Sequence, residues 1–477
     1  MKVSLFRSKV AKRDKKFCYG SIQVNKQIVA FATLVLLAVG CDDDADNSGS
    51  APYASRYEGL PAITTLLTGA TILTGTGERL DNADILLSNG KIVGVGKGLS
   101  ADGAEVVDAG GKWITPGVID VHSHLGVSAS PGTASHSDGN ESTSPVTAGV
   151  WAEHSVWPHD PGFTTALSGG VTALQILPGS ANLIGGRSVT LKNVPGRNVQ
   201  DMKFPGAPYG MKMACGENPK RIYGGLGVAP STRMGNVAGY RSAWIAAADY
   251  RDKMAAAEKD RGEAPMRDLQ LETLVGVLNG EILVHNHCYR GDEMSVMLDI
   301  AKEFGYKVGT FHHAVEAYKV ADLLAEADTC AAMWADWWGF KMEAFDAIRE
   351  NAAIVDRAGA CAIIHSDDEL HIQRLNQETA KVMGAAARAG IDIPPERAIQ
   401  WITKNPAKSL GIDAVTGTLE PGKMADVVLW DGDPFSVYTR AERVYIDGAL
   451  AYDKNNPAGN PVTDFTLGTA AAAGGAQ

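Results

Sequence analysis

The sequence predicts an α/β protein that combines a (β/α)8 TIM-like barrel with a small β-sandwich formed from both ends of the mature chain. Strand-like runs alternate with helical patterns in the middle of the chain, whereas short strand-like runs separated by turn residues lie near both ends. All eleven histidines fall between His122 and His371. We therefore expect the barrel, and any metal chemistry, in the middle segment.

The composition is that of a soluble globular protein, with 45% hydrophobic and 21% charged residues among 477. A chain of this length can bury a large core. The formal net charge of −11 argues against a nucleic-acid partner, because a phosphate backbone attracts basic surfaces.

The N-terminus has the pattern of a secretory signal. Eight Lys and Arg residues, opposed by one Asp, precede an apolar run at 28–39 that is too short to span a bilayer comfortably. The run ends in L-A-V-G-C and resembles a bacterial lipoprotein site with Cys41 as the lipidated first residue. Losing those eight positive charges and one negative charge leaves the mature chain at −18. We expect a periplasmic lipoprotein, with Asp42 favouring the inner membrane; an uncleaved anchor is the alternative.

These features divide the chain into five segments. A lipoprotein-type signal precedes a flexible acidic linker, and two sandwich segments bracket the barrel before a C-terminal tail. The expected bounds are 1–40 for the signal, 41–59 for the linker, 60–113 and 415–455 for the sandwich, 114–414 for the barrel, and 456–477 for the tail.

The two sandwich segments carry short strand-like runs. Asn89-Gly90 separates two of the N-terminal runs and is a strong hairpin signal. A second set of runs occupies 417–434 and 443–452. Neither set has enough strands to close alone, so we expect the two ends of the chain to meet in one small β-sandwich.

Seven strands of the barrel can be placed from the sequence, and an eighth cannot. Residues 294–304 and 317–327 have the apolar spacing of helices. Asn182 to Gly186 is expected to be a turn that lets the backbone approach the site. The candidate strands are 114–122, 171–176, 210–215, 281–287, 306–312, 329–333 and 360–365.

Side chains that can bind a metal follow most of these strands. His122 and His124 close the first strand, and a period of two places both imidazoles on one face, about 7 Å apart along the backbone. Later strands are followed by Glu217, His287, His313 and Asp367. Each one alone would more often be a buried structural residue. Together, at the carboxyl ends of successive strands, they suit one or two divalent ions such as zinc.

Nine segments between about residues 60 and 455 match the motifs of one known superfamily. They are W-I-T-P-G-V-I-D-V-H-S-H, N-L-I-G-G-R-S-V-T-L-K, G-M-K-M-A-C-G-E-N-P-K-R, H-C-Y-R-G-D-E-M, H-A-V-E-A-Y-K-V-A-D, D-W-W-G-F-K-M-E-A-F, H-S-D-D-E-L, T-K-N-P-A-K-S-L-G-I and G-T-L-E-P-G-K-M-A-D-V-V-L-W. With these segments the chain resembles the amidohydrolase superfamily, in the branch similar to imidazolonepropionase and metal-dependent dipeptidases. This resemblance implies a barrel with a β-sandwich made from both ends.

The resemblance also implies roles for the residues at the strand ends. It makes His122 and His124 ligands of a first metal and His287 and His313 ligands of a second. Asp367 becomes a metal ligand that doubles as general base. A shared anion lowers the repulsion between two dications; Glu217 is preferred for this bridge, with a carboxylated Lys212 as the alternative.

Other residues near these ligands have two interpretations each. Lys212, if it is not the bridge, is a cation beside the metals or a substrate contact. His285 supports the ligands or packs, His312 is expected to be structural, and His365 orients substrate or base or packs. Tyr289 and Arg290 lead toward the rim, where Arg290 binds a substrate carboxylate or pairs with Asp292 or Glu293.

Two further residue classes carry expectations. Trp334, Trp337 and Trp338 form either a lid over the site or packing. Cys215, Cys288, Cys330 and Cys361 lie in apolar segments without a C-x-x-C pair and are expected to be buried free thiols. A disulfide or ligand role for Cys215 and Cys288 is the alternative.

The expected function is hydrolysis of a C–N bond in an amide, cyclic amide or dipeptide-like substrate by a metal-activated water. A deaminase of a nitrogen heterocycle uses the same residues. A non-catalytic metal- or ligand-binding lipoprotein is the non-enzyme alternative. The expected partners are a small-molecule substrate and, through the anchor, a membrane, and the sequence leaves homo-oligomerisation open.

Overall fold

We describe a computed structural model of the chain, which covers residues 53–259 and 262–460. The predicted signal, the lipidation site at Cys41, most of the linker and the end of the C-terminal tail lie outside these residues. Within the described part, none of the helices has both the length and the apolar character needed to cross a membrane.

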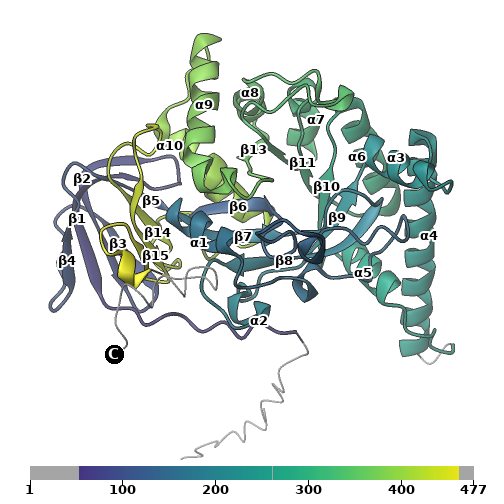
Figure 1. Cartoon of the computed structure of the whole chain (residues 1–477), viewed down its shortest axis with the longest axis horizontal. Helices are drawn as coiled ribbons and strands as arrows, with labels where there is room; N and C mark the ends of the chain where they lie inside the picture. Colours follow the sequence, from purple (N-terminus) through teal and green to yellow (C-terminus); the bar gives the residue numbers. More distant parts are fainter. Residues whose placement is uncertain (1–52, 260–261, 461–477) are drawn as a thin grey trace, which may run out of the picture. The chain divides into compact units, whose positions relative to one another are not determined.

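The predicted barrel is present as an eight-stranded sheet in the middle of the chain (Figure 1). Its strands neighbour one another in chain order, and seven of the eight run parallel. The first and last strands nearly close the circle, because the N–H of Asp367 donates to the carbonyl of His122 at 3.0 Å. The strands are β6 (Val118–Ser123), β7 (Val171–Ile176), β8 (Ile184–Lys192), β9 (Gly210–Ala214), β10 (Leu283–His287), β11 (Val308–His312), β12 (Cys330–Met333) and β13 (Cys361–Ile364).

The strand that the sequence could not place is β8, and it runs antiparallel to both β7 and β9. The expectation of a turn at Asn182–Gly186 is therefore wrong for its second half, because β8 begins at Ile184. Gly186, at φ +116°, is needed for close packing rather than for a turn. A Cβ there would lie 2.4 Å from the carbonyl oxygen of Val150.

The predicted first strand is divided in two at Gly117. Trp113–Pro116 (β5) joins the terminal sheet, and the barrel begins with β6. A Cβ at Gly117 would lie 2.0 Å from Oγ1 of Thr172, so the chain passes between the two sheets where only glycine fits.

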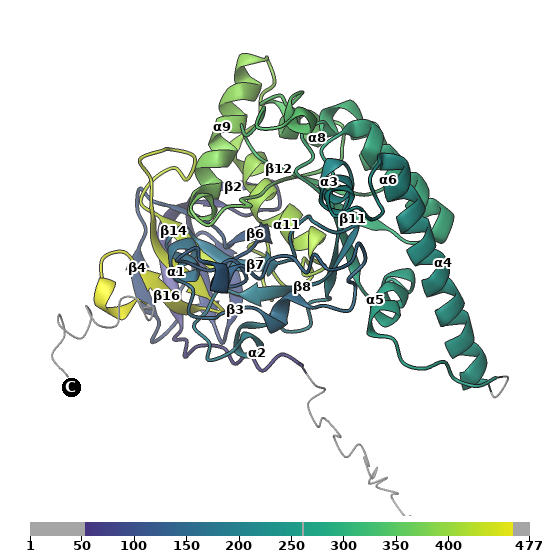
Figure 2. The same ribbon diagram turned by 45° about the vertical axis from the view of Figure 1, so that its right-hand side comes forward.

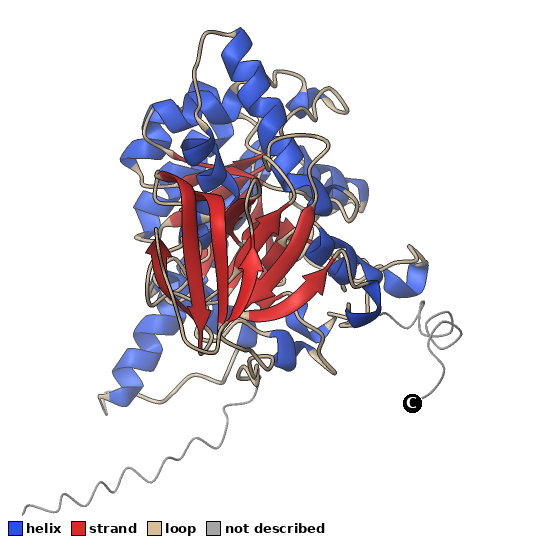
Figure 3. Ribbon diagram, turned by 90° about the vertical axis from the view of Figure 1, so that its left-hand side faces the viewer, coloured by secondary structure: helices blue, strands red, loops and turns tan. Residues whose placement is uncertain are grey.

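Strands from both ends of the described chain, purple and yellow in Figure 1, form one eight-stranded sheet, which faces the viewer in Figure 3. The sequence predicted that the two ends meet in a small β-sandwich, and their strands do meet, within a single hydrogen-bonded sheet. The predicted hairpin is confirmed: Asn89 and Gly90 have φ values of 50° and 75° and join two antiparallel strands. The pairing order is β16-β15-β14-β5-β1-β2-β3, with β4 beside β1. These strands are β1 (Thr65–Leu73), β2 (Arg79–Ser88), β3 (Lys91–Gly96), β4 (Glu105–Asp108), β14 (Val427–Trp430), β15 (Ala441–Ile446) and β16 (Ala449–Asp453).

Helices follow most barrel strands and cover the outside of the barrel (Figures 1 and 2). Both predicted helices are present, as α6 and α7. The long helix α4 runs beside α5 (Figure 2). The helices are α1 (Pro161–Ser168), α2 (Val199–Met202), α3 (Glu217–Gly225), α4 (Arg233–Glu258), α5 (Leu269–Leu278), α6 (Gly291–Phe304), α7 (Ala321–Glu326), α8 (Asn351–Arg357), α9 (Leu375–Arg388), α10 (Pro395–Ala398) and α11 (Lys404–Ser409).

The expectation of free thiols is wrong, because the four cysteines form two disulfides. Cys215 and Cys288 follow the neighbouring strands β9 and β10, with their Cα atoms 5.2 Å apart. Cys330 and Cys361 begin β12 and β13, are paired in register and have Cα atoms 4.4 Å apart. Strand register therefore brings each pair within bonding range.

Candidate metal centre

The two histidines of the H-x-H motif meet the carboxylate of Asp367. His122 and His124 lie at the end of β6, and each Nε2 is 3.3 Å from Oδ1 of Asp367. One ligand atom from each of the three residues lies within 4.8 Å of the others. His124 and Asp367 keep about a quarter of their side chains exposed, so the cluster opens to solvent at these two residues.

A chain of buried imidazoles orients His122. Its Nδ1 lies 2.8 Å from Nδ1 of His312, whose Nε2 lies 3.0 Å from Nδ1 of His285. All three rings are fully buried. His312 and His285 therefore occupy the far side of the His122 ring and leave its Nε2 facing Asp367.

His124 and His287 are oriented in the same way by oxygen atoms. Nδ1 of His124 lies 2.9 Å from the carbonyl of Leu177, and Nδ1 of His287 lies 2.9 Å from Oγ of Ser180. Each contact fixes Nδ1 and directs Nε2 toward the site, as is usual for histidines that bind metals. Nε2 of His124 lies 3.3 Å from Oδ1 of Asp367, and Nε2 of His287 lies 3.4 Å from Nδ2 of Asn218, a contact that a metal bound at His287 would replace.

His313 and Asp367 have unusual backbone conformations that place their side chains. Their φ values are 56° and 55°, in the left-handed region that residues other than glycine rarely adopt. Nε2 of His313 lies 3.7 Å from Oδ2 of Asp367. The backbone N–H of His313 donates to Nε2 of His365 at 3.3 Å. Left-handed residues of this kind gather at functional sites.

A buried carboxylate under the site holds the strand ends in place. Oδ1 of Asp120 accepts the N–H groups of His122 at 3.1 Å and Ser366 at 3.3 Å, and Ser366 also donates its hydroxyl to Asp120. Burial raises the pKa of Asp120 to about 7. Asp120 therefore links the end of β6 to the loop that carries Asp367.

Lys212 projects into the barrel beside these residues. It is paired in register with His285 on β10 and is fully buried. Its Nζ donates to the carbonyl of Pro178 at 3.1 Å and lies 3.4 Å from Nε2 of His122. None of the described carboxylates forms an ion pair with it, and burial lowers the pKa of Lys212 to about 7.

Glu217, the bridge that the sequence analysis preferred, contacts a lysine rather than the histidines of the described chain. It begins α3, beyond the end of β9, and its Oε1 lies 3.6 Å from Nζ of Lys341. None of the histidines of the described chain is in ion-pair contact with it. Of the two candidates for a bridging anion, the structure brings Lys212, and not Glu217, to the cluster.

The remaining predicted residues divide between the site and the surface. The Tyr289 ring packs against His287 with centroids 4.6 Å apart, and Trp334 stacks on His313 at 4.4 Å. Trp338, by contrast, is 53% exposed. Arg290 makes an exposed two-pronged contact with Asp292, which is the second of the two roles that the sequence allowed.

The chemistry of this donor set fits a divalent cation. Burial, with smaller contributions from nearby cationic groups, lowers the pKa values of His122, His287 and His313 well below 6.5. Their rings are therefore neutral at neutral pH, which is the state that binds a metal. Nδ1 of His313 and of His365 is buried without a hydrogen-bond partner among the described residues.

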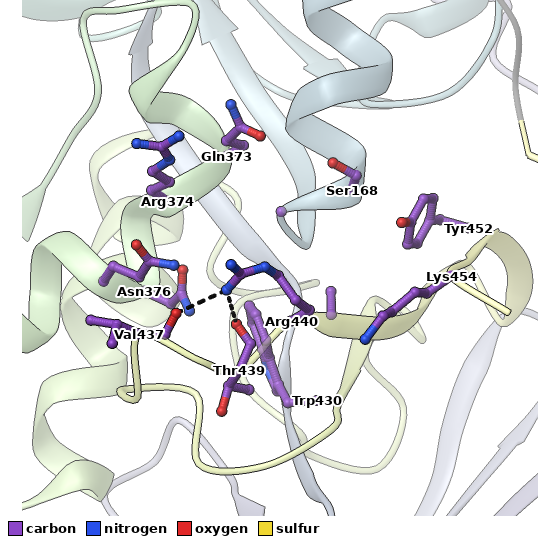
Figure 4. Close-up of a pocket in the computed structure, with 13 residues that line it drawn as sticks. Ser168, Gln373, Arg374, Asn376, Trp430, Val437, Thr439, Arg440, Tyr452 and Lys454 are labelled. Atoms are coloured by element: carbon purple, nitrogen blue, oxygen red, sulfur yellow. Dashed lines mark hydrogen bonds between the residues drawn. The ribbon is translucent and has the colours of Figure 1, made fainter. Parts of the chain in front are cut away.

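A cavity lined by other residues lies elsewhere and does not contain these groups (Figure 4). It has a volume of about 460 Å³ and is lined by residues of α1, α9 and the terminal sheet. Arg440 is one of its cations, and its guanidinium donates to the carbonyls of Val437 and Thr439 (Figure 4). Because it lacks histidine and carboxylate ligands, we do not assign the reaction to this cavity.

Sequence reasoning missed Asp120, Ser180 and Lys341. Asp120 had a detectable signal, since it precedes His122 by two residues and a buried strand rarely carries an unpartnered carboxylate. The sequence offered no signal for Ser180 or Lys341, because their partners lie more than 100 residues away.

Comparisons with known proteins bear on the family of the chain. A sequence model described as Amidohydrolase family matches residues 345–469. Amidohydrolase tasK of Hapsidospora irregularis is 32% identical over 395 residues, or 78% of this chain, although the chain spans only 40% of that protein. A 5-methylthioadenosine/S-adenosylhomocysteine deaminase of Symbiobacterium thermophilum is 25% identical, with 77% of this chain and 85% of that protein covered.

A solved structure extends the likeness to the fold. The crystal structure of an amidohydrolase from Thermotoga maritima MSB8 is 35% identical to this chain, with a TM-score of 0.76. The match covers 82% of this chain and all of that one. The chain therefore belongs to the amidohydrolase family.

Proposed function

We propose that the protein is a metal-dependent hydrolase that cleaves a C–N bond of a small amide. The observation that carries this proposal is the convergence of His122, His124, His313 and Asp367 at the open end of the barrel. Neutral imidazole nitrogens and one carboxylate are ligands that suit zinc.

The ligand set divides into two groups. His122, His124 and Asp367 would hold one ion, and His287 and His313 would hold a second ion, if one binds. A bound divalent cation would supply a water of lowered pKa and would polarise the carbonyl group of the substrate.

We infer that Lys212, rather than Glu217, supplies the bridging anion, after carboxylation of its amine. A neutral lysine amine adds to CO2 to give a carbamate and one proton. The fully buried Nζ, which lies 3.4 Å from His122 and has no carboxylate partner among the described residues, is placed for that modification. Glu217 already contacts a cation, Lys341.

Asp367 is the proposed general base. Its carboxylate is accessible to solvent and within 3.3 Å of both histidines of β6, so it can accept a proton from the attacking water. The same carboxyl group then donates that proton to the leaving nitrogen. Asp120 and Ser366 position the loop that carries it.

The export of the protein remains part of the proposal. Two disulfides suit an oxidising compartment. We propose a periplasmic protein tethered to the membrane by a lipid at Cys41. Expression of the full chain in bacteria, with and without an inhibitor of the lipoprotein-specific signal peptidase, tests this point. The unprocessed form should accumulate only when the inhibitor is present.

Activity is tested with metal-stripped protein that is reloaded with zinc and offered N-acyl amino acids and dipeptides. The proposal expects hydrolysis that depends on the metal and yields a carboxylic acid and an amine. Release of free ammonia from a heterocycle would instead favour a deaminase, the activity named for the Symbiobacterium relative. Full metal loading with no turnover of either class would favour a binding protein.

A further inference from the structure

One cation at the mouth of the site has few partners. Lys341 lies in the loop after β12, and its side chain is 18% exposed. Its Nζ donates to Oδ1 of Asn218 at 2.9 Å, and Oε1 of Glu217 lies at 3.6 Å, an ion-pair distance longer than a hydrogen bond. Among the described residues, Asn218 is thus its one acceptor at hydrogen-bond distance, although an ammonium group has three donors.

Lys341 is connected to the candidate metal ligands through Asn218. Nδ2 of Asn218 lies 3.4 Å from Nε2 of His287, while the other end of the same amide accepts from Lys341. The ammonium group also lies 4.1 Å from the centroid of the Tyr289 ring, which packs against His287. A substrate amide held at the histidines would therefore have its neighbouring substituent within reach of Lys341.

The surroundings of Lys341 do not fully compensate its charge. Burial lowers the pKa of Lys341, which means that its neighbours stabilise the ammonium form less well than water does. Other basic side chains of the site rim are paired: Arg233 contacts both Glu293 and Glu343, and Arg290 contacts Asp292. Lys341 also has an ion-pair partner, Glu217 at 3.6 Å, but among the described residues its ammonium group donates one hydrogen bond, to Asn218, so two of its donors remain for a ligand.

We propose that Lys341 is a specificity residue that binds an anionic group of the substrate, so that the preferred substrates are amides bearing a carboxylate next to the scissile bond. This inference rests on the proposed hydrolase function. The carboxylate would take up the unused donors of the ammonium group. Glu217 and Asn218 hold the ammonium group in place before substrate arrives.

The test compares two ligands that differ in one group, N-acetyl-phenylalanine and the neutral alcohol N-acetyl-phenylalaninol. With zinc-loaded enzyme, Lys341→Met should lower kcat/KM for the acid by about 10- to 100-fold, the range for a lost hydrogen bond to a charged group. It should change kcat/KM for the alcohol by less than about 3-fold, and Lys341→Arg should recover most of the activity on the acid.

A second readout does not depend on catalysis. Calorimetry on the metal-free protein should give tighter binding of the acid than of the alcohol, and Lys341→Met should remove that difference. Lys319→Met is the matched control, because Lys319 is a surface lysine paired with Glu316 and Asp346. It should leave both measurements unchanged.

The outcomes separate the two proposals. If neither compound is hydrolysed but Lys341→Met still weakens binding of the acid, the hydrolase function fails and the anion site stands. If both compounds lose activity equally in Lys341→Met, or if wild-type protein binds the acid no better than the alcohol, the assignment of Lys341 is overturned.

Discussion

Two fully buried lysines on neighbouring strands of the barrel have opposite environments. Lys192, the last residue of β8, contacts both carboxylate oxygens of Asp426 at 3.0 Å and Oδ1 of Asp447 at 2.9 Å. Lys212, on β9, contacts a backbone carbonyl at 3.1 Å and a histidine nitrogen at 3.4 Å, and none of the carboxylates in the described part of the chain is in ion-pair contact with it. The same residue type is neutralised in one place and left without a counter-charge in the other.

This difference indicates that Lys192 has a structural role and that Lys212 has a chemical one. Asp426 precedes β14 and Asp447 follows β15, so Lys192 joins the barrel to the terminal sheet by charge. Tyr57 completes that network by donating its hydroxyl to Asp447 at 2.5 Å. Lys212 joins no such network and faces the candidate ligands, which is why we assign the reactive amine to it.

Substitution of the two lysines by methionine should give the largest and most contrasting effects. Lys192→Met leaves two carboxylates buried without their cation, so we expect a loss of about 3–5 kcal/mol in the free energy of unfolding. Lys212→Met should leave stability within about 1 kcal/mol, because no carboxylate loses its partner, but should abolish hydrolysis. Urea denaturation and metal analysis of both variants measure this. Equal destabilisation by the two substitutions would contradict the contrast.

The two disulfides extend the comparison to the two ends of the barrel. Cys215–Cys288 joins the ends of β9 and β10 beside the site, and its removal in the Cys215→Ala/Cys288→Ala variant should cost about 2–4 kcal/mol and lower metal content. The matched control, Cys330→Ala/Cys361→Ala, removes the bond at the starts of β12 and β13. It should destabilise the protein while metal content stays unchanged. Metal loss in both variants would argue against a local effect.

Acid should weaken the metal-free protein through its buried histidines. Burial lowers the pKa of His285 to about 3 and of His365 to about 4, so both stay neutral when folded while the unfolded chain binds protons below about pH 6.5. The free energy of unfolding therefore decreases as the pH is lowered from 7 to 5, by about 2 kcal/mol for each ring. Asp120, with its raised pKa, opposes this by about 2 kcal/mol, because the folded state holds its proton more tightly.

The net change between pH 7 and 5 should be a loss of stability, since the lowered pKa values of His122, His287, His312 and His313 act in the same direction. Denaturation midpoints of the metal-free protein at the two pH values measure it. A higher midpoint at pH 5 would show that these rings are not held neutral.

Much of the fold followed from sequence periodicity. The seven parallel strands and the hairpin at Asn89-Gly90 were predicted because each has a strong local signal. Strand β8 was missed since it is buried almost throughout and begins beside two glycines, so it lacks alternation. The disulfides depend on strand register, which a single sequence does not reveal.

The part of the candidate site that follows directly from strand positions was predicted. His122, His124, His313 and Asp367 follow their strands directly, and the rule that barrel sites lie at strand ends placed them together. That rule also favoured Glu217, which lies past the strand in α3, over Lys212, whose side chain points into the barrel. Which of the two reaches the histidines depends on where β9 ends, at Ala214.

Glu217→Gln should have the smallest effect of these substitutions. If Glu217 only steadies Lys341, the variant keeps its metal and loses less than about 5-fold in kcat/KM, in line with the low value of a partly exposed ion pair. Loss of metal from the Glu217→Gln variant would instead support Glu217 as the bridging ligand.

The central claim is that the uncompensated Lys212 becomes the bridging carbamate. It is tested most directly by 13C NMR of protein loaded with zinc in the presence of 13C-labelled bicarbonate. Wild-type protein and Glu217→Gln should both show a carbamate resonance, and Lys212→Met should show none. Absence of the resonance from fully metal-loaded wild-type protein would contradict the account.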